Sequence, residues 1–133
     1  MNPAEIIPLE QRYPATAEAV PMIRHAIVEF AARLGADAEH RTGIALAVTE
    51  GCANVVVHAY DGAAERGEML VRARGDADGL DVVVTDEGSG LLPRPDSPGV
   101  GLGIPLMSHL AESMDFRTAP GGRGTELHLH FGL

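Results

Sequence analysis

Residues 48–60, "VTEGCANVVVHAY", form a mostly apolar stretch in which three polar side chains recur at intervals of four. The three are Glu50, Asn54 and His58. Residues four apart lie on one face of an α-helix, about 40° apart around its axis and ~6 Å apart along it. An unpaired carboxylate in a dry core costs several kcal/mol, so this polar stripe should face solvent or a cleft while the rest of the helix packs on a core.

The sequence on either side of this stretch predicts one further helix before it, and strands with a third helix after it. Apolar residues recur at intervals of three and four before it, and short runs rich in β-branched residues follow it. The expected helices span 16–34, 37–59 (with Asp37 as N-cap) and 105–110 (opened by Pro105), and the expected strands span 6–9, 69–74, 80–86, 114–118 and 125–131. Hairpin-linked strands with helices grouped elsewhere indicate a single α+β domain over residues 1–133. We expect a two-layer α/β sandwich whose mixed, mostly antiparallel sheet carries helices on one face.

Composition excludes several classes of function. The chain has 133 residues, a net charge of −9 and 4% aromatic residues, which argues against a surface for nucleic acid or an anionic membrane. All ten basic residues are arginine, so neither a Walker A lysine nor the strand lysine of eukaryotic-type protein kinases is present. The single cysteine, Cys52, cannot form an intramolecular disulfide, and its place on an apolar helix face indicates a core residue rather than a nucleophile. We expect a soluble, cytoplasmic protein, because neither a signal peptide nor a bilayer-length apolar run is recognisable.

The polar stripe of residues 48–60 has two interpretations. If it faces a cleft, the side-chain carbonyl of Asn54 is a hard oxygen donor suited to Mg²⁺, which usually takes few protein ligands besides substrate phosphates. Glu50, one turn away, could then accept a proton from an attacking hydroxyl or water. The alternative is a solvent-facing stripe on a surface helix.

A second motif, "DEGSG" at residues 86–90, follows the strand-like run "VVVT". The carboxylate of Asp86 would lie at a pocket floor, where Gly88 and Gly90 let a flat ligand approach the backbone. A buried carboxylate accepts hydrogen bonds, so it favours adenine, which offers an amino group where guanine presents a carbonyl. The alternative is an ordinary turn after a strand.

A third motif, "PGVGLGIPLM" at residues 98–107, places three alternating glycines before a helix. Backbone amides without side-chain crowding at a helix N-terminus are suited to phosphate. The glycines are Gly99, Gly101 and Gly103. This is not the dinucleotide-binding fingerprint, because Ile104 stands where that motif has its last glycine. Taken alone, such a run is weak evidence for a site.

The order and spacing of these motifs resemble the GHKL ATPase superfamily, which includes gyrase-type topoisomerases and histidine kinases. The shared elements are Glu-x-x-x-Asn on a helix, Asp-x-Gly-x-Gly after a strand, Gly-x-Gly before a helix and Gly-Thr opening a last strand. Within the superfamily, "LAVTEGCANVVVHAY" and "GLGIPLM" are most similar to small bacterial anti-sigma factors of the HATPase_c_2 type, which are serine/threonine protein kinases. The resemblance covers residues 13–131 and implies the Bergerat-type ATP-binding fold.

The resemblance implies roles for individual residues. Glu50 would be the catalytic base and Asn54 the Mg²⁺ ligand, in a site that takes ATP with Mg²⁺. Asp86 would bind the adenine amino group, and Thr125 would join it through a water-mediated contact. The glycines that would shape the adenine pocket or approach the phosphates are Gly88, Gly90, Gly99, Gly101 and Gly103. The implied partners are a sigma factor, an anti-anti-sigma protein of the STAS type and a second copy of the chain.

Two features depart from the pattern of these kinases. Gly51 stands where alanine is more common, and only residues 91–98 lie between the second and third motifs, where many relatives have a longer lid. Arg94 or Arg123 would have to supply positive charge for phosphoryl transfer. ATP binding is therefore better supported than phosphotransfer.

Four functions follow from these observations, in decreasing order of support. The first is an anti-sigma-factor-type serine/threonine kinase that binds Mg-ATP, phosphorylates an anti-anti-sigma partner and regulates a sigma factor. The second is a non-catalytic, ATP-dependent switch that sequesters a sigma factor or another regulator. The third is the ATP-binding fragment of a histidine kinase. It is disfavoured because no helical dimerisation segment with a phosphoacceptor histidine is recognisable in the sequence. A purely structural domain would make the order of the motifs a coincidence.

Three of the six histidines lie in the last expected strand or at the end of the second expected helix. His128 and His130 alternate on the last expected strand and so share one face, but the sequence offers no third metal ligand at a telling distance. An exposed sheet face is therefore the preferred interpretation. For His58, in the "HAY" motif of the resemblance, we expect a structural role at the helix end.

Overall fold

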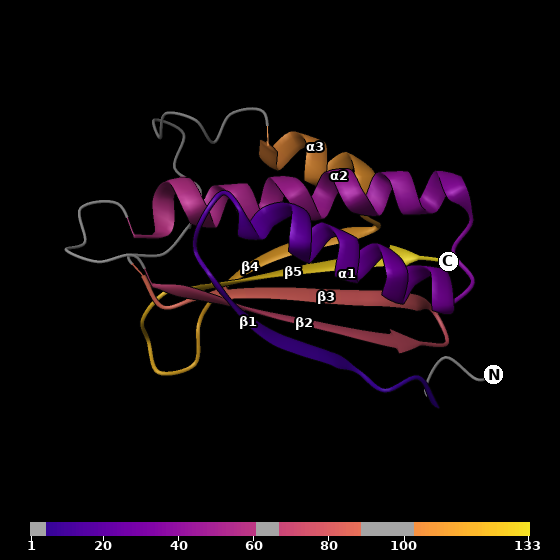
Figure 1. Ribbon diagram of the computed structural model, residues 1–133, viewed down its shortest axis with the longest axis horizontal. Helices are drawn as coiled ribbons and strands as arrows, with labels where there is room; N and C mark the ends of the chain where they lie inside the picture. The colour runs from indigo at the N-terminus through magenta and orange to yellow at the C-terminus, as the bar shows by residue number, and fades with distance from the viewer. Residues whose placement is uncertain (1–4, 61–66, 89–102) are drawn as a thin grey trace.

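The computed structural model describes residues 5–60, 67–88 and 103–133. Its helices are α1 (Ala19–Arg33), α2 (Ala38–Asn54), the π-helical turn η2 (Val55–Ala59) that continues α2, and α3 (Gly103–Leu110). Its strands are β1 (Leu9–Pro14), β2 (Glu68–Asp76), β3 (Gly79–Asp86), β4 (Ser113–Thr118) and β5 (Thr125–Gly132). Figure 1 shows the helices lying together on one side of a five-stranded sheet. The expected two-layer α+β architecture is confirmed.

The sheet has the strand order β1-β2-β3-β5-β4. Each of the four pairings among the described strands is antiparallel. These strands therefore form a fully antiparallel sheet, whereas a mixed, mostly antiparallel sheet was expected. The chain leaves β3 by way of α3, returns as β4, and then folds back as β5 between the two. As a result, β3 and β4 run in the same direction but are not neighbours.

Some element boundaries differ from the expectation. The edge strand was expected at 6–9, but β1 begins at Leu9 and pairs with β2 as far as Pro14 opposite Glu68. A proline is tolerated there because it is at the end of an edge strand, where its missing N–H breaks no interior ladder. The third helix begins at Gly103, which places Pro105 within its first turn, where proline is also tolerated.

The helix α2 lies in the middle of the helix layer, packed against both α1 and α3. Asp37 caps it as expected, because its Oδ1 accepts a hydrogen bond from the backbone N–H of His40 at 2.8 Å. Gly51 explains how closely α2 approaches the sheet. A Cβ at this position would lie 2.8 Å from Cδ2 of Leu127 on β5 and 3.5 Å from Sδ of Met107 on α3.

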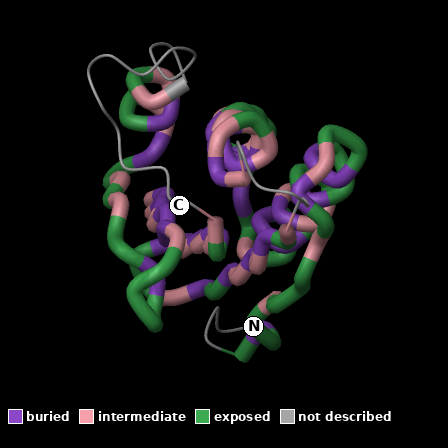
Figure 2. Tube along the Cα trace, turned by 90° about the vertical axis from the view of Figure 1, so that its left-hand side faces the viewer, coloured by how far each residue is buried: buried purple, intermediate pink, exposed green. Residues whose placement is uncertain are grey.

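The hydrophobic core fills the space between the helices and the inner face of the sheet, where Figure 2 shows the buried residues gathered. Cys52 is fully buried within it, and burial raises the pKa of its thiol to about 12, so it is the core residue that was expected. The 22 residues Ala38–Ala59 are long and apolar enough to span a bilayer by those two criteria. In this fold they form the middle helix of the helix layer, packed against α1 and α3.

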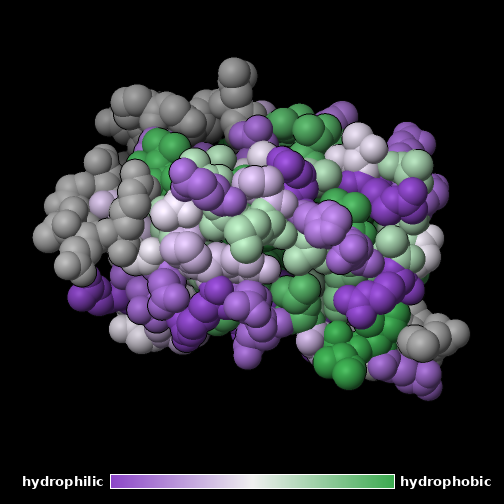
Figure 3. All heavy atoms as spheres, viewed as in Figure 1, coloured by the Kyte–Doolittle hydropathy of each residue, from purple (hydrophilic) through white to green (hydrophobic). Residues whose placement is uncertain are grey.

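Shortening one core side chain provides a test of this packing. Ile27 on α1 is fully buried, so Ile27→Val should destabilise the protein by about 0.5–1.5 kcal/mol in urea denaturation. Ile7 is the matched control, because it is 83% exposed, near the N-terminal end where Figure 3 shows apolar side chains gathered. The same change at Ile7 should leave the midpoint unchanged, and equal effects at both positions would contradict the assigned core.

Candidate nucleotide-binding site

The helix α2 carries the first two expected site residues. Glu50 is partly exposed, whereas Asn54 is only 8% exposed, at the last position of the α-helix. The helix then widens into the π-helical turn η2, a feature that often accompanies functional sites. Glu50 and Asn54 lie four positions apart on the α-helix and so share a face. His58 lies within η2 and is half-buried.

Asp86 lies at the end of β3 and is only 1% exposed. Its Oδ1 accepts a hydrogen bond from the backbone N–H of Gly88 at 3.0 Å. Its Oδ2 is buried and has no hydrogen-bond partner among the described residues. Burial raises the pKa of this carboxyl group, while hydrogen bonds from the backbone N–H groups of Gly88 and Thr125 oppose that shift. A buried acceptor without a donor is costly, and the exocyclic amino group of adenine is a donor that would complete it.

Thr125 is placed beside Asp86 by the register of the sheet. Thr85 on β3 pairs with Glu126 on β5, so the next residues along, Asp86 and Thr125, lie side by side. Both are buried and both point toward the helix layer. The structure thus brings together two residues that are 39 positions apart in the sequence, as the resemblance implied.

Two glycines allow backbone segments to meet at this site. A Cβ on Gly88 would overlap the carbonyl oxygen of Ala59, at the end of η2. A Cβ on Gly124, whose φ is +81°, would overlap the carbonyl oxygen of Asp86. In the structure Gly88 lets the end of η2 approach the segment after β3. Its expected role of letting a ligand approach remains a prediction. Gly124 was recognised only as part of the Gly-Thr motif, without its close approach to Asp86.

The expected phosphate side of the site lies largely beyond the described residues. Gly99, Gly101 and Arg94 fall in 89–102, as does Gly90 of the expected adenine pocket, so their roles remain predictions. Gly103 is the first residue of α3, which agrees with its expected position at a helix N-terminus. Arg123 is exposed in the loop between β4 and β5.

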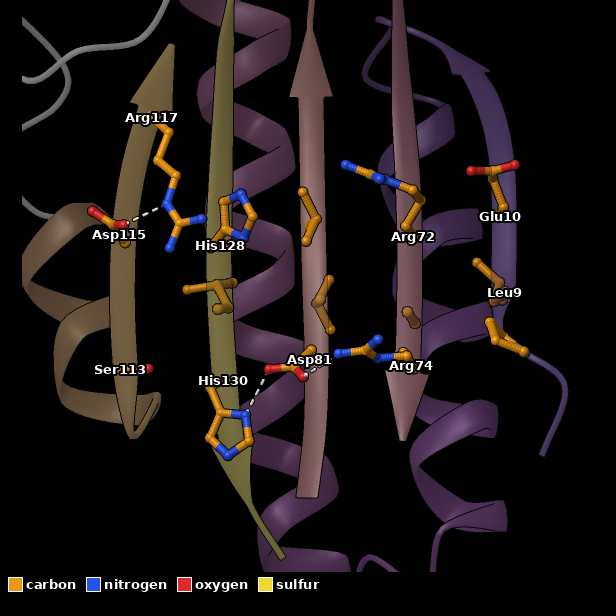
Figure 4. Close-up of a pocket in the computed structure, with 15 residues that line it drawn as sticks. Leu9, Glu10, Arg72, Arg74, Asp81, Ser113, Asp115, Arg117, His128 and His130 are labelled. Carbon is orange, nitrogen blue, oxygen red and sulfur yellow. Dashed lines mark hydrogen bonds and ion pairs between the residues drawn. The ribbon is translucent and has the colours of Figure 1, made fainter. Parts of the chain in front are cut away.

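A groove of about 650 Å³ lies on the other face of the sheet, away from the helices (Figure 4). His128 and His130 share this face as expected. His128 Nε2 lies 3.0 Å from Glu126 Oε1, and His130 Nδ1 lies 2.7 Å from Asp81 Oδ1. Asp86 and Thr125 point to the opposite face, so this groove is separate from the candidate nucleotide site.

The β2–β3 hairpin places two carboxylates, Asp76 and Asp81, near His130, which the sequence did not reveal. Potential ligand atoms of Asp76, Asp81 and His130 lie within 4.8 Å of one another. Hydrogen bonds within the protein already occupy them. Asp76 Oδ1 accepts from the N–H groups of Asp78 and Gly79 at 2.7 and 2.9 Å, and Asp81 pairs with His130. We therefore interpret the group as a hydrogen-bonded cluster rather than a metal centre.

The pair of His130 and Asp81 makes stability depend on pH. The hydrogen bond to Asp81 raises the pKa of His130 above its ordinary value of 6.5. Because the folded pKa is the higher one, the stabilisation is fully present below the unfolded pKa and is lost as pH rises through the folded pKa. Urea denaturation should therefore show a loss of stability as pH rises above about 6.5, and this loss should be smaller in His130→Asn. His109→Asn, at an exposed position of α3, should keep the full loss. Identical pH profiles for His130→Asn and the natural protein would contradict this account.

Comparison with known proteins assigns the family. Residues 13–131 match the histidine kinase-like ATPase domain. The chain is 27% identical to the anti-sigma F factor of Pasteuria penetrans, over 91% of this chain and 87% of that protein. It is 30% identical to the serine-protein kinase RsbW of Halalkalibacterium halodurans, over 85% of this chain and 77% of that protein. It is also 37% identical to the sensor histidine kinase PdtaS of Mycobacterium tuberculosis, over 70% of this chain but only 20% of that protein.

A solved structure agrees with these relatives. The structure of the RsbU and RsbW domains of Rv1364c from Mycobacterium tuberculosis matches with a TM-score of 0.71 at 26% identity, over 95% of this chain and 32% of that one. The chain belongs to the histidine kinase-like ATPase domain family. The expected likeness to anti-sigma-factor kinases within it is confirmed by the two full-length relatives.

Proposed function

We propose that this chain binds ATP with Mg²⁺ and is a serine/threonine protein kinase of the anti-sigma-factor type. The observation that carries the proposal is the buried carboxylate of Asp86, whose Oδ2 lacks a partner among the described residues. Family membership and the position of Asp86 next to Thr125 support adenine as the group that completes it. A carboxylate acceptor favours adenine over guanine, because guanine presents a carbonyl at the corresponding edge.

Each residue of the proposed site has a separate role. Asp86 holds the adenine amino group, and Thr125 adds a contact to the same base through water. Asn54 provides an oxygen ligand for Mg²⁺, which neutralises charge on the phosphates when it is bound. Glu50, on the same helix face one turn earlier, takes the proton from the attacking hydroxyl of a serine or threonine. Gly88 and Gly90 shape the adenine pocket, and Gly99, Gly101 and Gly103 supply backbone N–H groups for the phosphates.

Two relatives support the proposed partners. An anti-sigma F factor and a serine-protein kinase are both similar to this chain over most of their length. We therefore assign it a sigma factor as the regulated partner and an anti-anti-sigma protein of the STAS type as the phosphorylated one. The protein acts in the cytoplasm as a homodimer, without direct contact to nucleic acid or membrane. The net charge of −9 supports the absence of contact with nucleic acid or an anionic membrane.

A non-catalytic switch is the alternative, and the short segment 91–98 favours it because a short lid encloses the triphosphate less fully. Incubation of the protein with γ-labelled ATP and a STAS-type partner separates the two functions. Label on a serine or threonine of the partner supports the kinase, and its loss when that residue is changed to alanine is the control. ATP-dependent binding of the partner without label supports the switch. Absence of ATP binding would contradict both.

A further inference from the structure

Tyr60, the residue that follows η2, connects three segments of the protein. Its hydroxyl donates a hydrogen bond to the carbonyl oxygen of Glu68 at the start of β2, at 2.6 Å. The same hydroxyl accepts a hydrogen bond from the backbone N–H of Glu87 at 3.1 Å. Glu87 directly follows Asp86. One phenol therefore links the end of the helix that carries Asn54 to the segment that follows Asp86, whose Oδ2 has no partner among the described residues.

The ring of Tyr60 is held as closely as its hydroxyl. A Cβ on Gly67 would overlap the ring, and a Cβ on Gly88 would lie 3.1 Å from its Cδ1. Burial raises the pKa of the Tyr60 hydroxyl above its ordinary value of 10.0, although the hydrogen bond from Glu87 lowers it in part. The hydroxyl is therefore protonated at neutral pH and acts there as donor to Glu68 and acceptor from Glu87 at once.

We propose that Tyr60 is a positioning residue of the nucleotide site, which fixes the segment from Asp86 to Gly88 and thereby sets affinity for adenine and selectivity for adenine over guanine. The inference rests on the proposed function, because it takes ATP as the ligand of Asp86. Tyr60 fixes the peptide of Glu87, and Gly88 N–H fixes Oδ1 of Asp86, so Oδ2 is left aimed in one direction. Without the hydroxyl, that orientation is populated for a smaller fraction of the time and the apparent Kd rises in proportion.

The variant Tyr60→Phe removes one oxygen atom and keeps the ring. We expect the Kd and the KM for Mg-ATP to rise about 3- to 10-fold, as for the loss of a hydrogen bond, with kcat at saturating ATP within about twofold. The ratio of the Kd for GTP to the Kd for ATP should fall, which a general loss of folded protein would not cause. Tyr13→Phe is the matched control, because Tyr13 is the only other tyrosine, and it should leave all four quantities unchanged.

A second measurement needs no nucleotide. Amide hydrogen exchange of Glu87 in the free protein should be about 3- to 10-fold faster in Tyr60→Phe than in the natural protein or Tyr13→Phe. Faster exchange with unchanged Kd and unchanged selectivity overturns the proposal, because the hydrogen bonds of the Tyr60 hydroxyl then have only a structural role. Unchanged exchange overturns it as well. If exchange responds but the natural protein binds no ATP, the proposed function is wrong, and the nucleotide role of Tyr60 is wrong with it.

Discussion

Replacing Glu50 by glutamine should abolish transfer of phosphate to the partner protein while leaving the Kd for Mg-ATP within about twofold, because glutamine keeps the shape of the side chain but cannot accept the proton. A general base typically contributes about 10²- to 10⁴-fold to the rate, so a fall of this size in kcat is expected. Glu50 is partly exposed on α2, one turn before the buried Asn54, so it is accessible to a partner's hydroxyl. Initial rates with labelled ATP measure kcat, and calorimetry measures the Kd.

The matched control for this change is Glu39→Gln. Glu39 is exposed in the first turn of the same helix, and the substitution alters charge and shape in the same way. It should leave both kcat and the Kd unchanged. A Glu50→Gln variant with the activity of the natural protein would remove Glu50 from the mechanism, even if the ATP site itself proves real.

The second large effect is expected for Asp86→Asn, which should weaken ATP binding by about 100-fold or more. The amide oxygen can still accept from the N–H of Gly88, as Oδ1 does now at 3.0 Å. The amide nitrogen then occupies the place of Oδ2, so that a donor faces the amino group of adenine. Calorimetric titration of the natural and variant proteins with Mg-ATP measures the difference.

Asp81→Asn is the control for Asp86→Asn. Asp81 lies on the same strand, β3, but on the outer face of the sheet beside His130. This change should alter the pH dependence of stability and leave the Kd for ATP within about twofold, because the sheet separates Asp81 from the site. Natural affinity in Asp86→Asn would show that adenine does not bind at this carboxylate.

Much of the fold was predictable because its strongest signals are local. The helical periodicity of α1 and α2 and the alternating burial of β2, β3 and β5 both come from packing one face against the core. The range of β1 was wrong because "LEQRYP" has no clear strand pattern, and only pairing with β2 specifies it. The change from α2 to η2 was also not predictable, since "VVVHA" fits an α-helix equally well.

Parts of the candidate site could be predicted where a short sequence motif holds the residues of one role, as with Asp86 in "DEGSG". The pairing of Asp86 with Thr125 follows from sheet register, and the resemblance alone suggested it. Gly124 was recognised only as part of the Gly-Thr motif, without its close approach to Asp86. Tyr60 was missed because its role arises from a contact with Glu87, which is distant from it in sequence. No local pattern reports a contact of that kind. Two of the phosphate-side glycines, Gly99 and Gly101, lie in residues 89–102, and their roles remain predictions.

The most direct test of the central claim is calorimetric titration of the natural protein with Mg-ATP and, separately, with Mg-GTP. We predict one ATP bound per chain and GTP bound at least about 100-fold more weakly, because the Asp86 carboxylate accepts from adenine and repels the guanine carbonyl. Binding of neither nucleotide, or equal binding of both, would contradict an adenine site at Asp86.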